Sequence, residues 1–187
     1  MSESRPPAEA LGLAQRIVAG RARTVLLDGP SGSGKSTFAL DLLGALRRTT
    51  GAPRVDLVRM DDLYPGWSGL DAAARATCRD LVRPHAAGGR ASWRPWNWAY
   101  GTTAGMRVVR APLLLLEGCG AAPALSRARA DLTIWVEADE AQRRRRALDR
   151  DGALFEPHWD DWAEQFRRYC AREQPREGAD VVIDTSD

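Results

Sequence analysis

The chain has 187 residues and a mass of 20.5 kDa, which is the size of one domain, and its 44% hydrophobic residues are enough to build a buried core. Its 27 basic and 25 acidic residues give a net charge of +2, a balance that argues against a nucleic-acid or membrane partner. No segment approaches the roughly 18 consecutive apolar residues of a membrane-spanning helix.

The cysteines and the N-terminus predict the compartment. Cys78, Cys119 and Cys170 are far apart in the sequence and form no CxxC pair, which disfavours a disulfide scaffold and a zinc site. The N-terminal stretch before residue 10 lacks the apolar core of a secretory signal. We therefore expect a cytoplasmic protein.

Apolar runs alternate with helix-like stretches along the chain. In order, the pattern predicts a helix over 10–19, a strand over 24–28, a helix over 35–48, a strand over 55–60, a helix over 70–82, strands over 112–117 and 132–137, helices over 140–150 and 159–172, and a strand over 181–184. This alternation predicts an α/β fold with about five strands in a parallel sheet, helices on both faces and the strand over 24–28 in the centre. The run over 112–117 is apolar on both faces, as an inner parallel strand is.

Residues 83–111 interrupt the alternation with prolines and glycines. We expect a flexible loop or small hairpin excursion on the substrate side, so that residues 1–187 form one domain. Trp93, Trp96 and Trp98 fall in this stretch, and Trp67 precedes it. These side chains can stack on a planar or sugar-like substrate or form a small local core, and both alternatives stay open.

A glycine-rich loop follows the strand over 24–28. Residues 29–36 match G-x-x-x-x-G-K-[ST] in full, between an apolar strand and an amphipathic helix, which predicts a phosphate-binding loop. The residues expected to bind the phosphates are Gly29, Ser31, Gly32, Ser33, Gly34, Lys35, Ser36 and Thr37. Lys35 is the only lysine of the chain, and its compact ammonium suits the β- and γ-phosphates of ATP, while the Ser36 hydroxyl suits Mg²⁺.

Acidic residues close two of the predicted strands. Asp61 and Asp62 follow the strand over 55–60, which we expect to lie beside the strand over 24–28. A carboxylate there can accept a proton from an attacking hydroxyl and help to hold a metal ion, and we assign these roles to Asp61, with Asp62 as a helix cap or a supporting residue. Glu117 ends the strand over 112–117 and is expected to bind Mg²⁺ directly or through water. A solvated acid at the strand end is the alternative.

Four consecutive arginines begin at residue 143, within a segment over 139–152 that we expect to form a mobile lid. Arg143, Arg146 and Arg150 share one face of the predicted helix. Such a face can neutralise charge on a moving phosphoryl group, although arginine runs are also typical of solvated surfaces. We assign the catalytic role to Arg146 and Arg150.

Four motifs in this order resemble the uridine kinase and phosphoribulokinase group of P-loop kinases. They are residues 28–37, residues 60–64, residues 116–118, and Arg146 with Arg150 and Asp151. The resemblance spans residues 24–184 and implies a P-loop NTPase fold, with transfer of the γ-phosphoryl of ATP to a hydroxyl of a small molecule. It places Asp61 on the catalytic aspartate, Glu117 on the strand-end acid, and Arg146 and Arg150 on the lid arginines.

The motifs indicate the acceptor of the phosphoryl group less specifically than they indicate phosphoryl transfer. Uridine kinases carry an aromatic-Asp-aromatic triplet where this chain has Trp96-Asn97-Trp98. By resemblance we expect a nucleoside such as uridine to lie near Asp61, Tyr64, Trp96 and Trp98, with a sugar, a vitamin precursor or another small alcohol as the alternative.

Other functional classes fit less well. A regulatory GTPase needs an Asn-Lys-x-Asp motif, which the single lysine excludes. A motor or assembly ATPase needs oligomer surfaces, for which the chain leaves little room and shows no surface strip. A non-catalytic nucleotide binder is the remaining alternative. The two histidines, His85 and His158, lie too far apart in the sequence to support a histidine-based triad.

Overall fold

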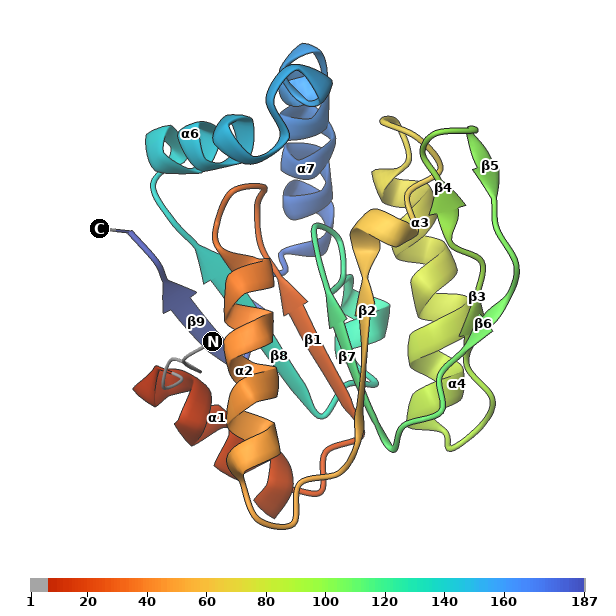
Figure 1. The fold of residues 1–187 in the computed structure, drawn as a ribbon, viewed down its shortest axis with the longest axis vertical. Helices are drawn as coiled ribbons and strands as arrows, with labels where there is room; N and C mark the ends of the chain where they lie inside the picture. The colour runs from red at the N-terminus through yellow and green to blue at the C-terminus, as the bar shows by residue number, and fades with distance from the viewer. Residues whose placement is uncertain (1–6, 187) are drawn as a thin grey trace.

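The computed structural model describes residues 7–186, and its core is a five-stranded parallel sheet with the strand order β2-β7-β1-β8-β9 (Figure 1). The strands are β1 (Thr24–Asp28), β2 (Val55–Arg59), β7 (Leu113–Glu117), β8 (Leu132–Glu137) and β9 (Val181–Asp184). The expected sheet, with its central first strand and the inner strand near 112–117, is confirmed. None of the helices within residues 7–186 is long and apolar enough to cross a membrane.

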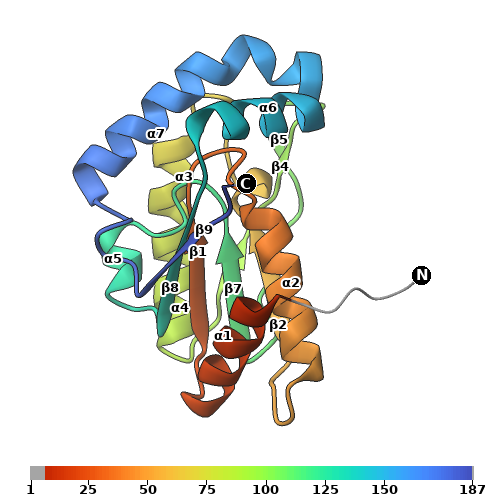
Figure 2. The same cartoon turned by 90° about the vertical axis from the view of Figure 1, so that its left-hand side faces the viewer.

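Helices cover both faces of the sheet (Figures 1 and 2). Successive strand residues point to opposite faces, so Val25 and Leu27 pack with α1 (Ala8–Ala19) and α2 (Lys35–Arg48), whereas Leu26 packs with α3 and α7. The bounds of these last helices are Leu70–Thr77 for α3 and Trp159–Glu173 for α7. The strand β1 is fully buried and has a hydrophobic core on each side. This packing fixes the position of its carboxyl end, where the glycine-rich loop begins.

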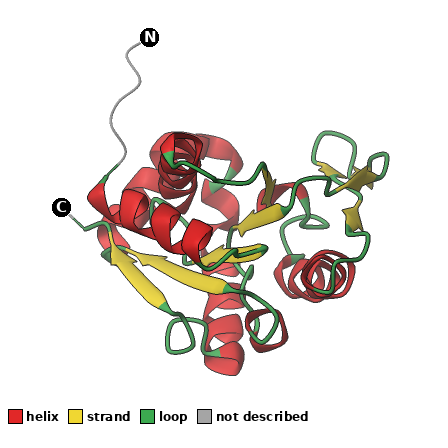
Figure 3. Ribbon diagram, turned by 90° about the horizontal axis from the view of Figure 1, so that it is seen from below, coloured by secondary structure: helices red, strands yellow, loops and turns green. Residues whose placement is uncertain are grey.

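The segment between β2 and β7 folds as short elements beside the sheet. They are η1 (Met60–Asp62), α3, the π-helical turn η2 (Cys78–Val82), α4 (Arg83–Ala86), and two antiparallel pairs, β3 (Ser92–Trp93) with β6 (Arg107–Val108) and β4 (Trp96–Asn97) with β5 (Thr102–Thr103). Viewed from below, the small pairs lie apart from the main sheet (Figure 3). Two short antiparallel pairs lie within residues 83–111, where a loop or small hairpin was expected, whereas residues 83–86 form α4. The flexibility of this segment and its place on the substrate side stay predictions.

The remaining elements lie between β7 and the C-terminus. They are α5 (Ala124–Arg127), α6 (Glu140–Asp151), and the 3₁₀ turns η3 (Gly152–Leu154) and η4 (Glu156–His158), which lead into α7. The lid segment expected over 139–152 corresponds to α6, which crosses over the top of the sheet in Figure 1.

One expected neighbour relation is wrong. The strand that precedes Asp61 was expected beside β1, but β2 pairs with β7, and β7 lies between β2 and β1. The burial of the two strands explains the order, since all of β7 is buried while β2 is mostly half-buried and suits the edge of the sheet. Asp61 also lies in η1 and does not end the strand itself.

A buried carboxylate joins the sheet to α7. Asp28, at the end of β1, accepts hydrogen bonds from the N–H groups of Gly29 (2.7 Å), Gly120 (3.0 Å) and Ala122 (2.9 Å) and from the Tyr169 hydroxyl (2.6 Å). Burial raises the pKa of Asp28, and these four donors oppose that rise. The carboxylate thus fixes the start of the glycine-rich loop against the loop after β7 and against α7.

We expect Tyr169→Phe to lower the free energy of unfolding at neutral pH by about 1.5–3 kcal/mol, because it removes a hydrogen bond to a buried carboxylate. The Tyr169 hydroxyl lowers the pKa of Asp28, so it stabilises the ionised form. The loss should therefore be largest above the pKa of Asp28 and should shrink as the pH falls through it.

Urea unfolding of wild type and variant across that pH range measures both effects. Tyr100→Phe removes the same hydroxyl from a side chain that is 80% exposed, and it should change stability by less than about 0.5 kcal/mol. A loss for Tyr169→Phe that does not vary with pH would contradict the assignment.

Candidate functional site

The glycine-rich loop leads from the end of β1 into the N-terminus of α2. Gly34 caps α2 without a side-chain hydrogen bond. Among the described residues, the N–H groups of Gly32, Gly34, Lys35 and Ser36 have no hydrogen-bond partner, and the buried Ser33 hydroxyl has none either. Free N–H groups at a helix N-terminus favour an anion, so the loop fits a phosphate group.

Lys35 is buried beneath this loop. Its ammonium donates to the main-chain oxygen of Pro30 (3.0 Å) and contacts the Cys119 sulfur at 3.5 Å. Burial by itself would lower the pKa of Lys35, but its surroundings, including the nearby carboxylates of Glu117 and Asp61, raise the pKa above its ordinary value. Lys35 is therefore a fixed positive charge at the carboxyl edge of the sheet.

Glu117 and Ser36 lie side by side under the same loop. The Ser36 hydroxyl donates to Glu117 Oε1 at 3.1 Å, and the Arg59 Nε lies 3.7 Å from the same oxygen. Burial raises the pKa of Glu117, Lys35 opposes the rise, and Asp61 adds to it. A hydroxyl beside a buried carboxylate is a set of hard oxygen donors that fits Mg²⁺.

These donors would share the ion with other ligands. Within residues 7–186, no cluster of three or more His, Cys, Asp or Glu side chains is arranged to hold a metal. Mg²⁺ typically binds through one or two protein oxygens and completes its shell with water and substrate phosphates. Ser36 and Glu117, with Asp61 nearby, match that mode of binding.

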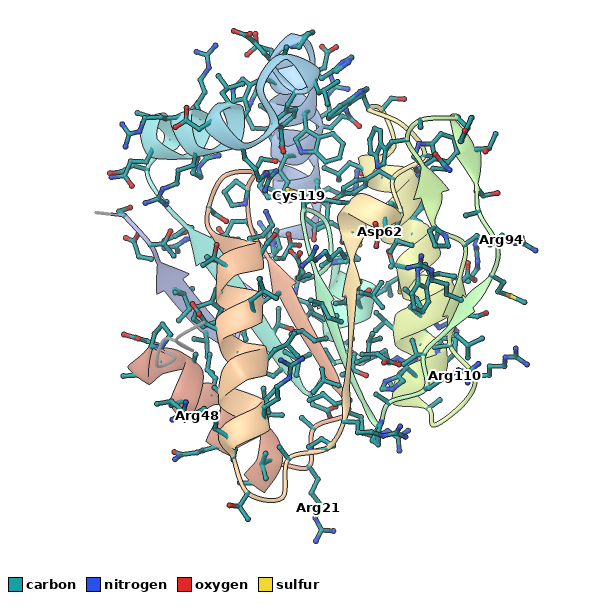
Figure 4. The ribbon with its side chains drawn as sticks, viewed as in Figure 1. Arg21, Arg48, Asp62, Arg94, Arg110 and Cys119 are labelled. Carbon is teal, nitrogen blue, oxygen red and sulfur yellow. The ribbon has the colours of Figure 1, made fainter. Side chains whose placement is uncertain are left out.

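Asp61 and Asp62 lie on the turn η1 with exposed side chains, and Figure 4 labels Asp62 on this turn after β2. The Asp61 charge contributes to the raised pKa values of both Lys35 and Glu117. The Trp98 indole N–H donates to the main-chain oxygen of Asp61 at 2.9 Å. The fold therefore brings Lys35, Glu117 and Asp61 together from three separate elements.

The helix α6 contacts the glycine-rich loop through its backbone. A Cβ on Gly32, whose φ is +78°, would lie 2.0 Å from the main-chain oxygen of Arg143. Arg143 itself donates to Ser31 O at 3.4 Å and to Ala138 O at 3.0 Å. Arg143 is therefore a contact of the loop that the sequence assignment to Arg146 and Arg150 passed over, although its place on the same helix face was visible.

The two arginines assigned to catalysis have different surroundings. Arg146 donates through Nη1 to the Thr185 hydroxyl (3.2 Å) and through Nη2 to the main-chain oxygen of Thr185 (3.0 Å). Arg150 forms a two-bond pair with Asp151, which is the main cause of its raised pKa, and Asp61 contributes to the same rise. Arg150 is thus within electrostatic range of Asp61, whereas Arg146 contacts the C-terminal segment.

The tryptophans were expected either to stack on a substrate or to form a small local core, and they differ in their surroundings. The Trp67 ring stacks on His158 at 4.4 Å and on Phe155 at 5.5 Å, and it lies 4.9 Å from the Trp98 ring. Trp67 and Trp98 therefore form a local core above η1. Trp93 and Trp96 line a cavity of about 550 Å³ between α3 and the two small strand pairs.

The placement of Tyr64 corrects an expectation. Tyr64 was expected beside the substrate, but it is 2% exposed, its hydroxyl donates to Cys119 O at 2.8 Å, and its ring packs edge-on against Trp162. Its aromatic face and hydroxyl are both engaged within the protein. The sequence analysis did not identify Cys119, which contacts Lys35, or Thr185, which contacts the glycine-rich loop. The only sign of either residue in the sequence is its position, after the motif over 116–118 for Cys119 and after the last strand for Thr185.

Comparisons with known proteins support the fold. No protein-family model matches the chain, and no curated protein matches its sequence. A possible uridine kinase from Bacillus stearothermophilus has a similar structure, with a TM-score of 0.66 and 20% identity over 94% of this chain and 98% of that chain. A putative fructose transport system kinase from Silicibacter sp. TM1040 has a TM-score of 0.56 and 19% identity over 92% and 98% of the two chains. The α/β fold expected from the motifs is thus confirmed.

The close approach of Arg143 to Gly32 can be tested with paired alanine variants. We expect Gly32→Ala to destabilise the protein by more than the roughly 1–2 kcal/mol of left-handed strain, because the new Cβ also meets a backbone oxygen. Gly12→Ala, in the exposed part of α1 where a Cβ meets nothing within 4 Å, should stabilise by about 0.5–1 kcal/mol. Thermal unfolding measures both. A loss for Gly32→Ala no larger than the strain would show that α6 stands away from the loop in solution.

Proposed function

We propose that the protein is an ATP-dependent kinase that transfers the γ-phosphoryl of ATP to a hydroxyl group of a small molecule. The observation that carries the proposal is the joint placement of Lys35, Glu117 and Asp61 at a loop whose N–H groups are free to bind phosphate. A protein that only binds nucleotide needs one carboxylate, here Glu117, to help hold Mg²⁺, whereas the second carboxylate, Asp61, can take the proton of an acceptor hydroxyl. The similarity in fold to two proteins described as kinases agrees with the proposal.

Each residue has a role in this reaction. The loop N–H groups and Lys35 hold the β- and γ-phosphates, and Ser36 and Glu117 would hold Mg²⁺, which when bound offsets phosphate charge. Asp61 accepts the proton of the acceptor hydroxyl while the oxygen of that hydroxyl forms a bond to the γ-phosphorus. The bond between the γ-phosphorus and the oxygen that bridges the β- and γ-phosphates breaks, and ADP leaves with that oxygen. Arg150 opposes the negative charge that develops during transfer.

A cavity beside the loop is suited to the nucleoside part of ATP. A cavity of about 550 Å³ is lined by Gly34, Thr37, Phe38, Arg146 and Thr185, among others. It adjoins the N-terminus of α2, where the phosphates are expected. This position supports binding of the base and ribose between α2 and the C-terminal segment.

The acceptor is proposed as a nucleoside such as uridine, in line with the motifs and with one structural neighbour. A second candidate is a sugar, a vitamin precursor or another small alcohol, and the structure of the Trp96-Asn97-Trp98 triplet favours it. The Asn97 side-chain oxygen accepts from the N–H groups of Ala99 (3.1 Å) and Tyr100 (3.3 Å). The amide oxygen of Asn97 is thus engaged in its own turn, which leaves its NH₂ group as a neutral donor in place of the aspartate acceptor.

A screen of ATP consumption against nucleosides, sugars and vitamin precursors tests the proposal and identifies the acceptor. Lys35→Ala should lower turnover of the best acceptor by roughly 10³-fold or more, because charge stabilisation and positioning are most of phosphoryl transfer. Full activity in that variant, or ATP turnover with no acceptor in a broad screen, would contradict a small-molecule kinase.

The general base can be tested in a matched pair. Asp61→Asn keeps the shape of the side chain and removes its ability to take a proton, so it should retain ATP binding and lose acceptor phosphorylation by roughly 10²–10⁴-fold. Asp62→Asn, on the same exposed turn, should lose much less. The reverse result would move the base to Asp62, and normal activity in both variants would place it elsewhere.

A further inference from the structure

The C-terminal segment, which lines the cavity proposed for the nucleoside, also contacts the glycine-rich loop and α6. Thr185 directly follows β9, and its N–H donates to Glu137 O at 2.9 Å, which continues the pairing of β9 with β8. Its hydroxyl donates to the main-chain oxygen of Ser33 in the glycine-rich loop at 2.8 Å, and it also lies 3.2 Å from Glu137 O. A residue near the C-terminus thus contacts the loop that is expected to hold the phosphates.

The same residue also holds the lid helix α6. Arg146 donates to the Thr185 hydroxyl at 3.2 Å and to its main-chain oxygen at 3.0 Å. Next along the chain, the Ser186 hydroxyl accepts from the N–H of Asp139, the residue that caps α6, at 3.1 Å. Two consecutive residues therefore contact α6, and Thr185 joins it to the loop.

The packing at Gly34 shows how close this contact is. Gly34 has a φ of +82°, and a Cβ there would lie 3.4 Å from the Thr185 hydroxyl oxygen. Gly34 immediately precedes Lys35, the residue expected on the β- and γ-phosphates. The Thr185 hydroxyl therefore lies against the turn that sets the position of Lys35 and of the first N–H groups of α2.

We propose that Thr185 is a positioning residue that couples Arg146 to the glycine-rich loop, and that it affects nucleotide binding through this coupling. The inference rests on the proposed function and deepens it. A hydroxyl has one proton to donate and lone pairs to accept, so it can donate to Ser33 O and accept from Arg146 at the same time. Valine has nearly the same shape and can do neither, whereas serine can do both.

The physical benefit is preorganisation. An arginine side chain has many rotamers, and ordering it when a nucleotide binds costs free energy. Arg146 held by Thr185 is already placed at the wall of the cavity beside α2, so less of that cost falls on binding. Because Thr185 also holds the carbonyl of Ser33, the arginine and the loop are positioned relative to each other.

A double-mutant cycle tests the coupling. Kd for ATP is measured by isothermal titration calorimetry for wild type, Thr185→Val, Arg146→Ala and the double variant. We expect Thr185→Val to weaken ATP binding about tenfold, through the loss of hydrogen bonding to a charged group. The double variant should bind no more weakly than Arg146→Ala alone, since the two residues act as a unit. Independent, additive losses would overturn the proposal.

Conservative and matched variants separate coupling from a general effect on folding. Thr185→Ser keeps the hydroxyl and should bind ATP with wild-type affinity. If Thr185→Ser binds as weakly as Thr185→Val, the packing of the methyl group and not the hydroxyl is responsible, and the proposal fails. Thr50→Val, at an exposed position in the turn after α2, should bind ATP as wild type does. If Thr185→Val does not fold, the cycle is run with Thr185→Ala, which is subject to the same two outcomes.

The outcomes also distinguish this inference from the proposed function. If the wild-type protein does not bind ATP, the proposed function and the inference both fail. If wild type binds ATP and the losses are additive, only the coupling fails. If ATP binds and the cycle shows coupling but no acceptor is phosphorylated, the positioning role stands and the kinase proposal fails.

Discussion

The Asp28 carboxylate is the interaction on which the rest of the site depends. It is fully buried at the end of β1, and a buried carboxylate is tolerated only when donors surround it. Three of its donors are backbone N–H groups, from the start of the glycine-rich loop and from the loop after β7, and the fourth is the Tyr169 hydroxyl of α7. Because none of these segments can move without leaving the charge unsatisfied, the loop begins from a fixed point.

A second buried pair of charges lies next to that point. Glu117 is 2% exposed and Lys35 is 8% exposed, and each shifts the pKa of the other toward its charged form. Their attraction offsets part of the cost of burial, and the low dielectric of the interior strengthens it. By contrast, the pair of Arg172 with Asp71 joins α7 to α3 at 2.8 Å but is half-exposed, so it contributes little to stability. The buried pair of charges, unlike this exposed one, lies where phosphate is expected to bind.

The helix α6 and a group of aromatic side chains lie at the carboxyl edge of the sheet, beside Lys35 and Glu117. On one side, α6 lies with its backbone against Gly32 and is joined to the loop through Thr185. On the other side, Trp67 stacks between the segment after α6 and Trp98, which holds the backbone of Asp61. The loop and the expected base are thus each held by a side chain from a distant part of the chain.

The sequence by itself determined the main strands and helices and the glycine-rich loop, because these depend on local patterns. The strands over 24–28, 132–137 and 181–184 and the helix over 35–48 occur at the predicted residues, since apolar periodicity and the glycines of the loop specify them within a few positions. Only the tertiary structure decided that β7 separates β2 from β1, that Tyr64 is buried, and that Arg143 and Thr185 contact the loop. Those outcomes rest on contacts between residues far apart, such as Thr185 and Ser33, which are 152 positions apart. No local pattern encodes such contacts, because they depend on which buried surfaces pack together when the whole chain folds.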